Sequence, residues 1–350
     1  MESFKTKHML KEKQYIQREN GEMVPAQFPV IVSASRSTDI PGFYADWFLH
    51  RLKVGYSAWT NPFNGVQSYV SYRDTRLIVF WSKNPEALLA KGGLLDYLEE
   101  KGIHCYIQYT LNDYVTEKLE KGVPPVSKRI DTFKRLVERL GVGKVIWRFD
   151  PLILTDEITI QDLLAKAENI GSQLKGYTEK MVFSFADISA YRKVRSNLIN
   201  NNIRYREFHD EDMLEFAAGI QQLNQEWGYT LATCGEKIDI EQFGIVHNKC
   251  VDDGLMIRFF SDDARLMEFL GVEITGGDLF NPEKTIIKHR NNKDKGQRQF
   301  CGCIISKDIG EYNTCAHLCE YCYANSSKEI ALRNLQSHKA NKCAETIIGK

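Results

Sequence analysis

Three cysteines lie close together near one end of this 350-residue chain, in the stretch Cys315-Ala-His-Leu-Cys319-Glu-Tyr-Cys322. The spacing C-x3-C-x2-C lets one short loop direct three thiolates to a single metal cluster. A cubane [4Fe-4S] cluster has four irons that each take an external ligand, so three thiolates leave one iron open. An open metal position is where a catalytic site binds a substrate or cofactor. The spacing therefore predicts a [4Fe-4S] cluster at Cys315, Cys319 and Cys322 with one free coordination position.

A second metal site is predicted from the cysteines that this motif does not use. Cys105 alternates with apolar neighbours and is expected in the core, and Cys343 lies in the tail, so the remaining cysteines are Cys234, Cys250, Cys301 and Cys303. Four thiolates close a zinc site or a second [4Fe-4S] site. The glycine in Cys301-Gly302-Cys303 allows both thiols to turn toward one metal. The alternative is that Cys234 and Cys250 are buried as small apolar residues.

The composition is that of an ordinary water-soluble protein. The chain has 46 basic and 46 acidic side chains, so no net charge attracts nucleic acid, and 43% of its residues are hydrophobic. No apolar run is long enough to cross a membrane, and the first residues lack the apolar core of a secretion signal. We therefore expect a cytoplasmic protein, in which a reducing environment keeps the cysteines free to bind metal.

Short apolar runs alternate with helical patterns about eight times between residues 30 and 270. This alternation predicts an α/β fold, a parallel TIM-like (β/α)8 barrel, rather than an open doubly wound sheet, for which no Gly-x-Gly-x-x-Gly fingerprint is present. The expected strands are Val30–Ser35, Tyr56–Thr60, Leu77–Trp81, Ile103–Thr110, Val145–Phe149, Met181–Phe185, Thr230–Thr233 and Gly244–His247, with Leu255–Phe260 as a replacement for the last. Residues 1–29 form an N-terminal extension or hairpin, 271–300 a linker arm, 301–325 the cluster motif and 326–350 a tail.

Polar residues follow nearly every predicted strand. In a barrel the carboxyl ends of the strands meet at one mouth, where active sites lie. The candidates for binding substrate there are Arg36, Asp39, Lys83, Asn84, Arg148 and Asp150, with Glu236 as a candidate for binding a cofactor. Each also has a simpler explanation: Asp39 and Asn84 precede prolines and suit helix starts, and Arg148 with Asp150 suits a buried salt bridge.

The linker arm explains how a motif near the end of the chain reaches the mouth. At about 3.3 Å per residue, residues 271–300 are long enough to climb the barrel wall, so that the cluster motif folds over the mouth. The arm is also basic between Lys284 and Arg298. A solvated loop is one explanation of these charges, and a contact with phosphate or nucleic acid is the other.

Four stretches together resemble a bacterial family of unknown function: SASRSTDIPGFY, FWSKNP, WRFDPL and TCAHLCEYCYAN. The resemblance spans about residues 30–325. More distantly, the last stretch is similar to the motif of radical S-adenosylmethionine (SAM) enzymes, including spore photoproduct lyase. That motif usually follows the first barrel strand near the N-terminus, although the thiamin pyrimidine synthase family also carries it near the C-terminus.

The radical SAM resemblance implies roles for individual residues. Cys315, Cys319 and Cys322 would bind the cluster, Tyr321 would lie against the adenine of SAM, and Glu236 after Gly235 would partly replace the missing Gly-Gly-Glu that holds its amino group. It further implies an electron donor such as flavodoxin or ferredoxin. Reductive cleavage of SAM would yield a 5′-deoxyadenosyl radical that attacks an unknown small-molecule or nucleic-acid-derived substrate.

Two other readings stay open. A binding module with a structural zinc site would use Cys315, Cys319 and Cys322 with a fourth ligand, which would be His317, Cys301 or Cys303. A metal-independent hydrolase would use Asp150 and Glu236 as acid and base.

Overall fold

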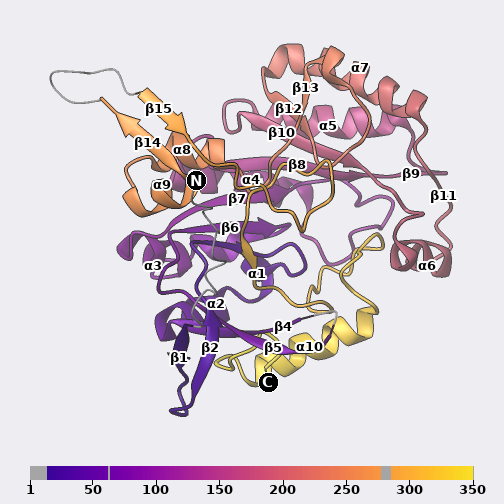
Figure 1. Ribbon diagram of the computed structural model, residues 1–350. Helices are drawn as coiled ribbons and strands as arrows, with labels where there is room; N and C mark the ends of the chain where they lie inside the picture. The colour runs from indigo at the N-terminus through magenta and orange to yellow at the C-terminus, as the bar shows by residue number, and fades with distance from the viewer. Residues whose placement is uncertain (1–13, 62–63, 277–284, 350) are drawn as a thin grey trace, which may run out of the picture.

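A parallel sheet of eight strands forms the centre of the computed structural model, which describes residues 14–61, 64–276 and 285–349 (Figure 1). Its order is β13-β12-β10-β8-β7-β6-β3-β16, and each neighbouring pair runs parallel. The strands are β3 (Ile31–Ala34), β6 (Leu77–Ser82), β7 (His104–Thr110), β8 (Val145–Leu152), β10 (Lys180–Phe185), β12 (Thr230–Thr233), β13 (Ile245–His247) and β16 (Lys307–Asp308).

The prediction of a closed (β/α)8 barrel is wrong. β13 and β16 are the two edges of this sheet, and no pairing joins them within the described residues. The predicted strand Tyr56–Thr60 does form, as β4, but it pairs with β5 in a different sheet. The alternative strand Leu255–Phe260 belongs to a helix, α8 (Asp253–Phe260).

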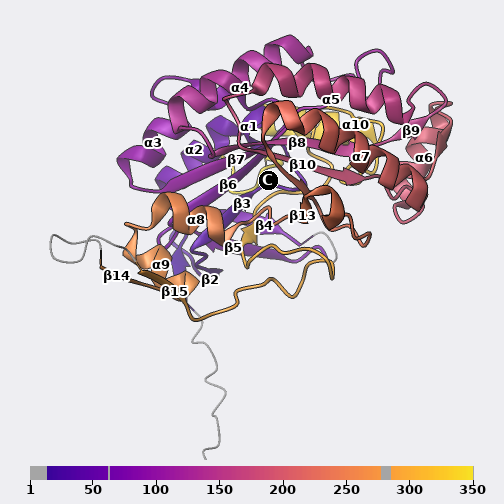
Figure 2. The same ribbon diagram turned by 90° about the horizontal axis from the view of Figure 1, so that it is seen from above.

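Helices cover both faces of the open sheet. Helices α8 and α9 (Ala264–Leu270) pack on the face that would line a barrel, against Leu77, Val79 and Tyr106. We call this the inner face. The edge strands β13 and β16 do not pair with each other in the described ranges, and the molecule has helices on both sides of the sheet (Figure 2).

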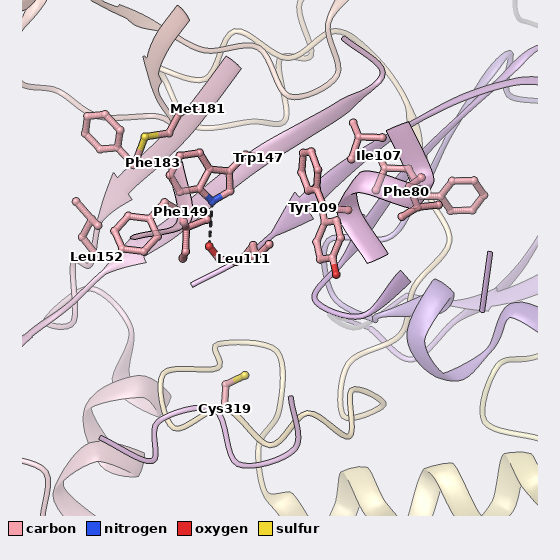
Figure 3. Packing of buried hydrophobic residues seen from close by; sticks show 14 of the residues in the cluster. Phe80, Ile107, Tyr109, Leu111, Trp147, Phe149, Leu152, Met181, Phe183 and Cys319 are labelled. Carbon is pink, nitrogen blue, oxygen red and sulfur yellow. Dashed lines mark hydrogen bonds between the residues drawn. The ribbon is translucent and has the colours of Figure 1, made fainter. Parts of the chain in front are cut away.

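The outer face packs against most of the other helices. Trp147 and Phe149 point to it from β8, whereas Arg148 between them points to the inner face, as the alternation along a strand predicts. Figure 3 shows these rings along the strands, with Cys319 in a loop beyond them. The helices that contribute to this core are α1 (Ile40–Phe43), α2 (Ala45–Val54), α3 (Leu94–Glu100), α4 (Val126–Leu140), α5 (Ile160–Leu174), α6 (Arg192–Asn200), α7 (Asp210–Trp227) and α10 (Lys328–Ala340).

Local sequence signals set several of these helix ends. Thr159 and Asp162 form a capping box at the start of α5, and α7 ends at Gly228, which adopts the left-handed conformation that glycine favours. Two 3-10 turns follow strands, at Pro85–Leu89 and Glu241–Phe243. Among the helices of the described ranges, none is long and apolar enough to cross a membrane.

Three smaller sheets lie around the centre. A mixed sheet has the order β1-β2-β5-β4, and two antiparallel pairs are β11-β9 and β14-β15. Their strands are β1 (Tyr15–Gln17), β2 (Met23–Gln27), β4 (Tyr56–Thr60), β5 (Gln67–Ser71), β9 (Leu154–Thr155), β11 (Tyr205–Arg206), β14 (Val272–Thr275) and β15 (Thr285–Lys288). Residues 1–13 of the predicted extension, 277–284 of the predicted arm and residue 350 lie outside the described residues.

The end of the chain returns to the start of the sheet. β16 pairs with β3 through Lys307–Val32 and Asp308–Ser33, and the cysteine-rich segment follows it directly. α10 then leads back to the mixed sheet, where Glu345 binds Arg18 at 2.8 Å. The last strand in the sequence is therefore an edge strand beside the first strand of the central sheet.

Candidate functional site

The cysteine loop, which we define as residues 314–323, lies over the carboxyl end of β3. Tyr44 donates a hydrogen bond to the Thr314 carbonyl at 2.6 Å, and the Thr38 and Thr314 hydroxyls are 2.6 Å apart. At the other end of the loop, the Tyr323 hydroxyl donates to the Arg36 carbonyl at 2.7 Å. These contacts place the loop at the edge of the sheet where the strand ends meet, although the barrel mouth expected there does not exist.

The segment after β7 holds the other side of the cysteine loop. The Gly122 amide donates to the His317 carbonyl, and the Glu320 amide donates to the Leu119 carbonyl, both at 2.9 Å. A Cβ atom at residue 122 would lie 2.7 Å from the carbonyl oxygens of Ala316 and His317, which is far too close. Glycine is therefore required at this position for the two segments to touch.

The three thiols of the cysteine loop form a suitable set of donors for a cluster. Burial raises the pKa of Cys315, Cys319 and Cys322, and the thiols act on one another through charge. The backbone amides of His317 and Asp39 act in the opposite direction on the pKa of Cys315, and those of Ala324 and Asn325 on the pKa of Cys322, so they partly offset the effect of burial.

The backbone turns sharply inside the loop. Leu318, between the first two cysteines, has a φ of 56°, a left-handed conformation that costs a residue with a side chain about 1–2 kcal/mol. Such conformations persist where the surrounding structure enforces them, often at functional sites. Within the ranges that the structure describes, however, no group of three or more His, Cys, Asp or Glu side chains has its donor atoms placed to hold a metal ion. The residue types fit a cluster, and the sulfurs are not yet arranged around one.

A buried polar network lies directly beneath the loop, around the Tyr321 hydroxyl. That hydroxyl donates to Glu120 and accepts hydrogen bonds from Lys83 at 2.9 Å and Asn112 at 3.3 Å. Lys83 also binds Glu120 at 2.7 Å, and Arg129 lies 3.6 Å from the same carboxylate. Burial opposes the charged form of Glu120, but the Lys83 and Arg129 cations outweigh it and lower its pKa to about 2.

Replacing Tyr321 by phenylalanine is expected to destabilise the protein, although the ring itself is kept. The substitution leaves Lys83, Asn112 and Glu120 without one buried hydrogen-bond partner, and each unsatisfied group of this kind costs about 1–3 kcal/mol. Urea unfolding of Tyr321→Phe should show this loss in the free energy of unfolding. Tyr191→Phe is the matched control, because Tyr191 is exposed, and a loss no larger than in this control would contradict the role of the network.

Asp39 and His317 form a second buried pair at the same place. His317 Nε2 lies 2.6 Å from Asp39, and its Nδ1 lies 3.1 Å from the Gly122 carbonyl. Asp39 is also the N-cap of α1, through the Gly42 amide at 2.8 Å, and it accepts from Ser82 and the Lys83 amide. Burial opposes its charged form, but His317 and these donors lower the pKa of Asp39. The helix-cap explanation is therefore confirmed for this residue, which also lies beside the cysteine loop.

Three further predicted strand-end residues, Arg36, Arg148 and Asp150, lie on the inner face. Arg148 binds Asp150 and donates to the Cys250 sulfur at 2.9 Å, and Asp150 also accepts from Ser184. The buried salt bridge considered from the sequence is therefore present. The Arg36 and Arg148 guanidinium carbons lie 5.0 and 5.4 Å from the centre of the Trp81 ring, so both cations contact this one aromatic side chain.

Glu236 and Asn84 belong neither to the Asp39–His317 pair nor to the Arg148–Asp150 pair. Glu236 accepts from the Phe185 amide at 3.1 Å, and burial raises its pKa to about 7. Asn84 is the residue before the first 3-10 turn and makes no side-chain capping bond there. Two surface hollows, of about 480 and 220 Å³, lie elsewhere, around α3, and none of the seven predicted metal-binding cysteines lines them.

The sequence did not indicate several residues of this site. Glu120 lies in a loop after β7 and Arg129 on α4, and nothing in their neighbourhoods marks them as buried. Asn112 is a polar residue shortly after the strand Ile103–Thr110, and this position is a signal that could have found it. A useful signal for Glu120 would have been the short segment Leu119-Glu120-Lys121-Gly122, in which the glycine permits a close backbone approach.

The protein is of the α/β class. It has a parallel central sheet, with a cysteine loop and a buried charge network at the carboxyl ends of its strands. The chain belongs to the family described as Domain of unknown function (DUF1848), whose model matches residues 31–324. This agrees with the resemblance that the four sequence stretches indicate. No curated protein and no solved structure matches the chain.

Proposed function

We propose that this protein is a radical SAM-like enzyme that binds a [4Fe-4S] cluster at Cys315, Cys319 and Cys322. The open iron of such a cluster would bind SAM, and one-electron reduction would cleave SAM to begin radical chemistry on a substrate. The substrate is a small molecule or a nucleic-acid-derived compound, and the electron would come from a protein such as flavodoxin or ferredoxin.

The observation that carries the proposal is the position of the cysteine loop in the sheet. The loop directly follows β16, an edge strand whose carboxyl end lies beside that of β3. In most radical SAM enzymes the motif follows the first strand of the barrel. In this chain the strand before the motif is last in the sequence but stands beside the first strand of the central sheet, so a motif near the C-terminus takes the usual spatial position.

The residues around the loop have complementary roles in this proposal. Lys83 keeps its positive charge although it is buried, because the neighbouring Glu120 raises its pKa, and it also acts electrostatically on Cys319. It would therefore offset part of the negative charge of three thiolates. Gly122 and Thr38 hold the loop against the sheet through backbone and hydroxyl contacts. Tyr321 would present its backbone toward the adenine, since its hydroxyl is bound in the buried network.

Two candidates for a fourth ligand, His317 and Cys303, have other partners, which argues against a closed zinc site in the same loop. Both ring nitrogens of His317 already have partners, namely Asp39 and the Gly122 carbonyl, so this side chain is not free to bind metal. Cys303 lies against Cys250 and Cys301, and its sulfur accepts from the amides of Cys250 and Val251, away from the cysteine loop. The loop thus keeps three thiols and no fourth ligand among the candidates, which suits an open cluster. A hydrolase that uses Asp150 is disfavoured because that carboxylate already binds Arg148 and Ser184.

Anaerobic reconstitution with iron and sulfide tests the proposal. The protein should become brown and hold about four irons in the loop, and after addition of dithionite and SAM it should release 5′-deoxyadenosine. Reactions without dithionite, and reactions with protein that was not reconstituted, are the controls. A cluster that is reduced by dithionite but yields no 5′-deoxyadenosine above these controls would contradict the proposed function.

A further inference from the structure

The second group of cysteines is brought together on the inner face from three distant parts of the chain. Cys234 follows β12, Cys250 follows β13, and Cys301 and Cys303 precede β16. The Cys234 and Cys250 sulfurs are 3.5 Å apart, and the Cys303 sulfur lies 3.3 Å from the Cys250 amide nitrogen. We call these residues the four-cysteine group. Cys301, two residues before Cys303, is its fourth member.

The sulfurs of this group also receive hydrogen bonds of the kind that thiolates need. The amides of Cys250 and Val251 donate to the Cys303 sulfur at 3.3 and 3.4 Å. The Cys250 sulfur accepts from the Asn248 side chain at 3.1 Å and from Arg148 at 2.9 Å. Arg148 is buried, so its charge acts strongly on the neighbouring sulfur. Two of these sulfurs thus accept hydrogen bonds from amide or guanidinium donors, as thiolate ligands do.

The spacing of the sulfurs indicates how many metal ions they would share. With zinc–sulfur bonds of about 2.3 Å, two thiolates on one tetrahedral ion lie about 3.8 Å apart. The 3.5 Å between Cys234 and Cys250 is close to that value. Thiolates that bind four different irons of a cubane must lie farther apart than thiolates that share one ion. The separation therefore favours a mononuclear site.

We propose that Cys234, Cys250, Cys301 and Cys303 bind one tetrahedral metal ion, with zinc the best match, at a site separate from the cysteine loop. In the described residues the four sulfurs do not yet surround one point, so the side chains would turn toward the ion when it binds. All positions would then be filled by thiolate, so the site is structural rather than catalytic.

The position of the group explains what such an ion would do. Cys234 and Cys250 belong to the edge of the sheet formed by β12 and β13, whereas Cys301 and Cys303 lead directly into β16 at the opposite edge. The Ile304 amide donates to the Val251 carbonyl at 3.1 Å, so the returning segment already lies along the inner face. The ion would join the two edges across this face and hold β16, with the cysteine loop after it, in place.

Metal analysis of the full-length wild type, two multiple variants and one control variant tests this inference, with zinc as the probe. Wild type and the triple variant Cys315→Ser/Cys319→Ser/Cys322→Ser, purified without oxygen, should each hold about one zinc per chain. The double variant Cys301→Ser/Cys303→Ser should hold none, and Cys343→Ser, an exposed cysteine, is its matched control. Because the triple variant cannot form the proposed iron–sulfur cluster, its zinc content is independent of the proposed function.

A second measurement decides the matter even if the double variant does not fold. Cobalt added to the metal-free triple variant should give the intense visible bands of tetrahedral Co²⁺ bound to thiolates. Absence of these bands, or unchanged zinc in a folded double variant, would overturn the inference. Two other outcomes would also overturn it: loss of iron instead of zinc in the double variant, which indicates a second cubane, and a disulfide between Cys234 and Cys250 detected by intact mass.

Discussion

Replacing Cys319 by serine is expected to remove the iron of the cysteine loop and to abolish formation of 5′-deoxyadenosine. Cys319 is the middle ligand of the proposed cluster and is buried beside Lys83 and Glu120. With two thiolates left, two of the four irons of a cubane would have no ligand from the loop. Iron after reconstitution should fall by about four per chain, and SAM cleavage should fall to the level of protein that was not reconstituted.

The matched control for this prediction is Cys343→Ser, since that cysteine is exposed and lies outside the cysteine loop. It should keep both iron and activity. Circular dichroism of Cys319→Ser should show a folded sheet, because the central strands do not depend on this side chain. A Cys319→Ser protein that retains full iron and cleaves SAM would show that the cluster lies elsewhere.

Replacing Glu120 by glutamine should cause the largest loss of stability of any single change at the site. The substitution leaves two buried cations, Lys83 and Arg129, without the carboxylate that lies between them. Removing one partner of a buried ion pair costs about 3–5 kcal/mol, because the remaining charge is left uncompensated. Urea unfolding should show a loss of this size. Glu100→Gln, which breaks the exposed pair with Lys101, should change stability little.

The same carboxylate predicts how stability depends on pH. The pKa of Glu120 is lowered from 4.5 to about 2 in the folded protein, so the folded state keeps the charged form more readily than the unfolded chain does. The contribution of the charged Glu120 carboxylate to the free energy of unfolding is therefore fully present above pH 4.5 and is lost as the pH falls toward 2. Glu120→Gln should show a weaker decline of stability over this interval than wild type. An identical decline in both proteins would show that Glu120 does not contribute to it.

Most individual elements could be predicted from the sequence, because each depends on local patterns. The run Leu77–Trp81 is apolar on both faces, which is typical of strands in a covered parallel sheet. The run Ile103–Thr110 is apolar on the face of Cys105 and Ile107 and more polar on the other, and both runs form strands. The alternation of Arg148 with Trp147 and Phe149 likewise determined which side chains face each side of the sheet.

Closure of the sheet could not be predicted in this way, because it depends on what fills the inner face. The segment Leu255–Phe260 is apolar enough for either a strand or a helix, and it forms α8, which packs on the inner face and adds no strand to the sheet. The two residues of β16 carry no strand pattern of their own, since their pairing with β3 is fixed by the surrounding contacts. The charge network around Glu120 was hidden for a similar reason: burial of a charged residue is a property of the tertiary structure.

The place of β16 also sets the order in which the protein is completed during synthesis. A ribosome adds about 5–20 residues per second, and domains fold as they emerge, starting from the N-terminus. The strands from β3 to β13 are therefore made several seconds before Lys307. During that interval β3 is an exposed edge strand, a surface prone to pairing with other chains. Delivery of iron and sulfide would then be the last step of maturation, and a nascent chain stalled before β16 should aggregate through the edge that this strand covers.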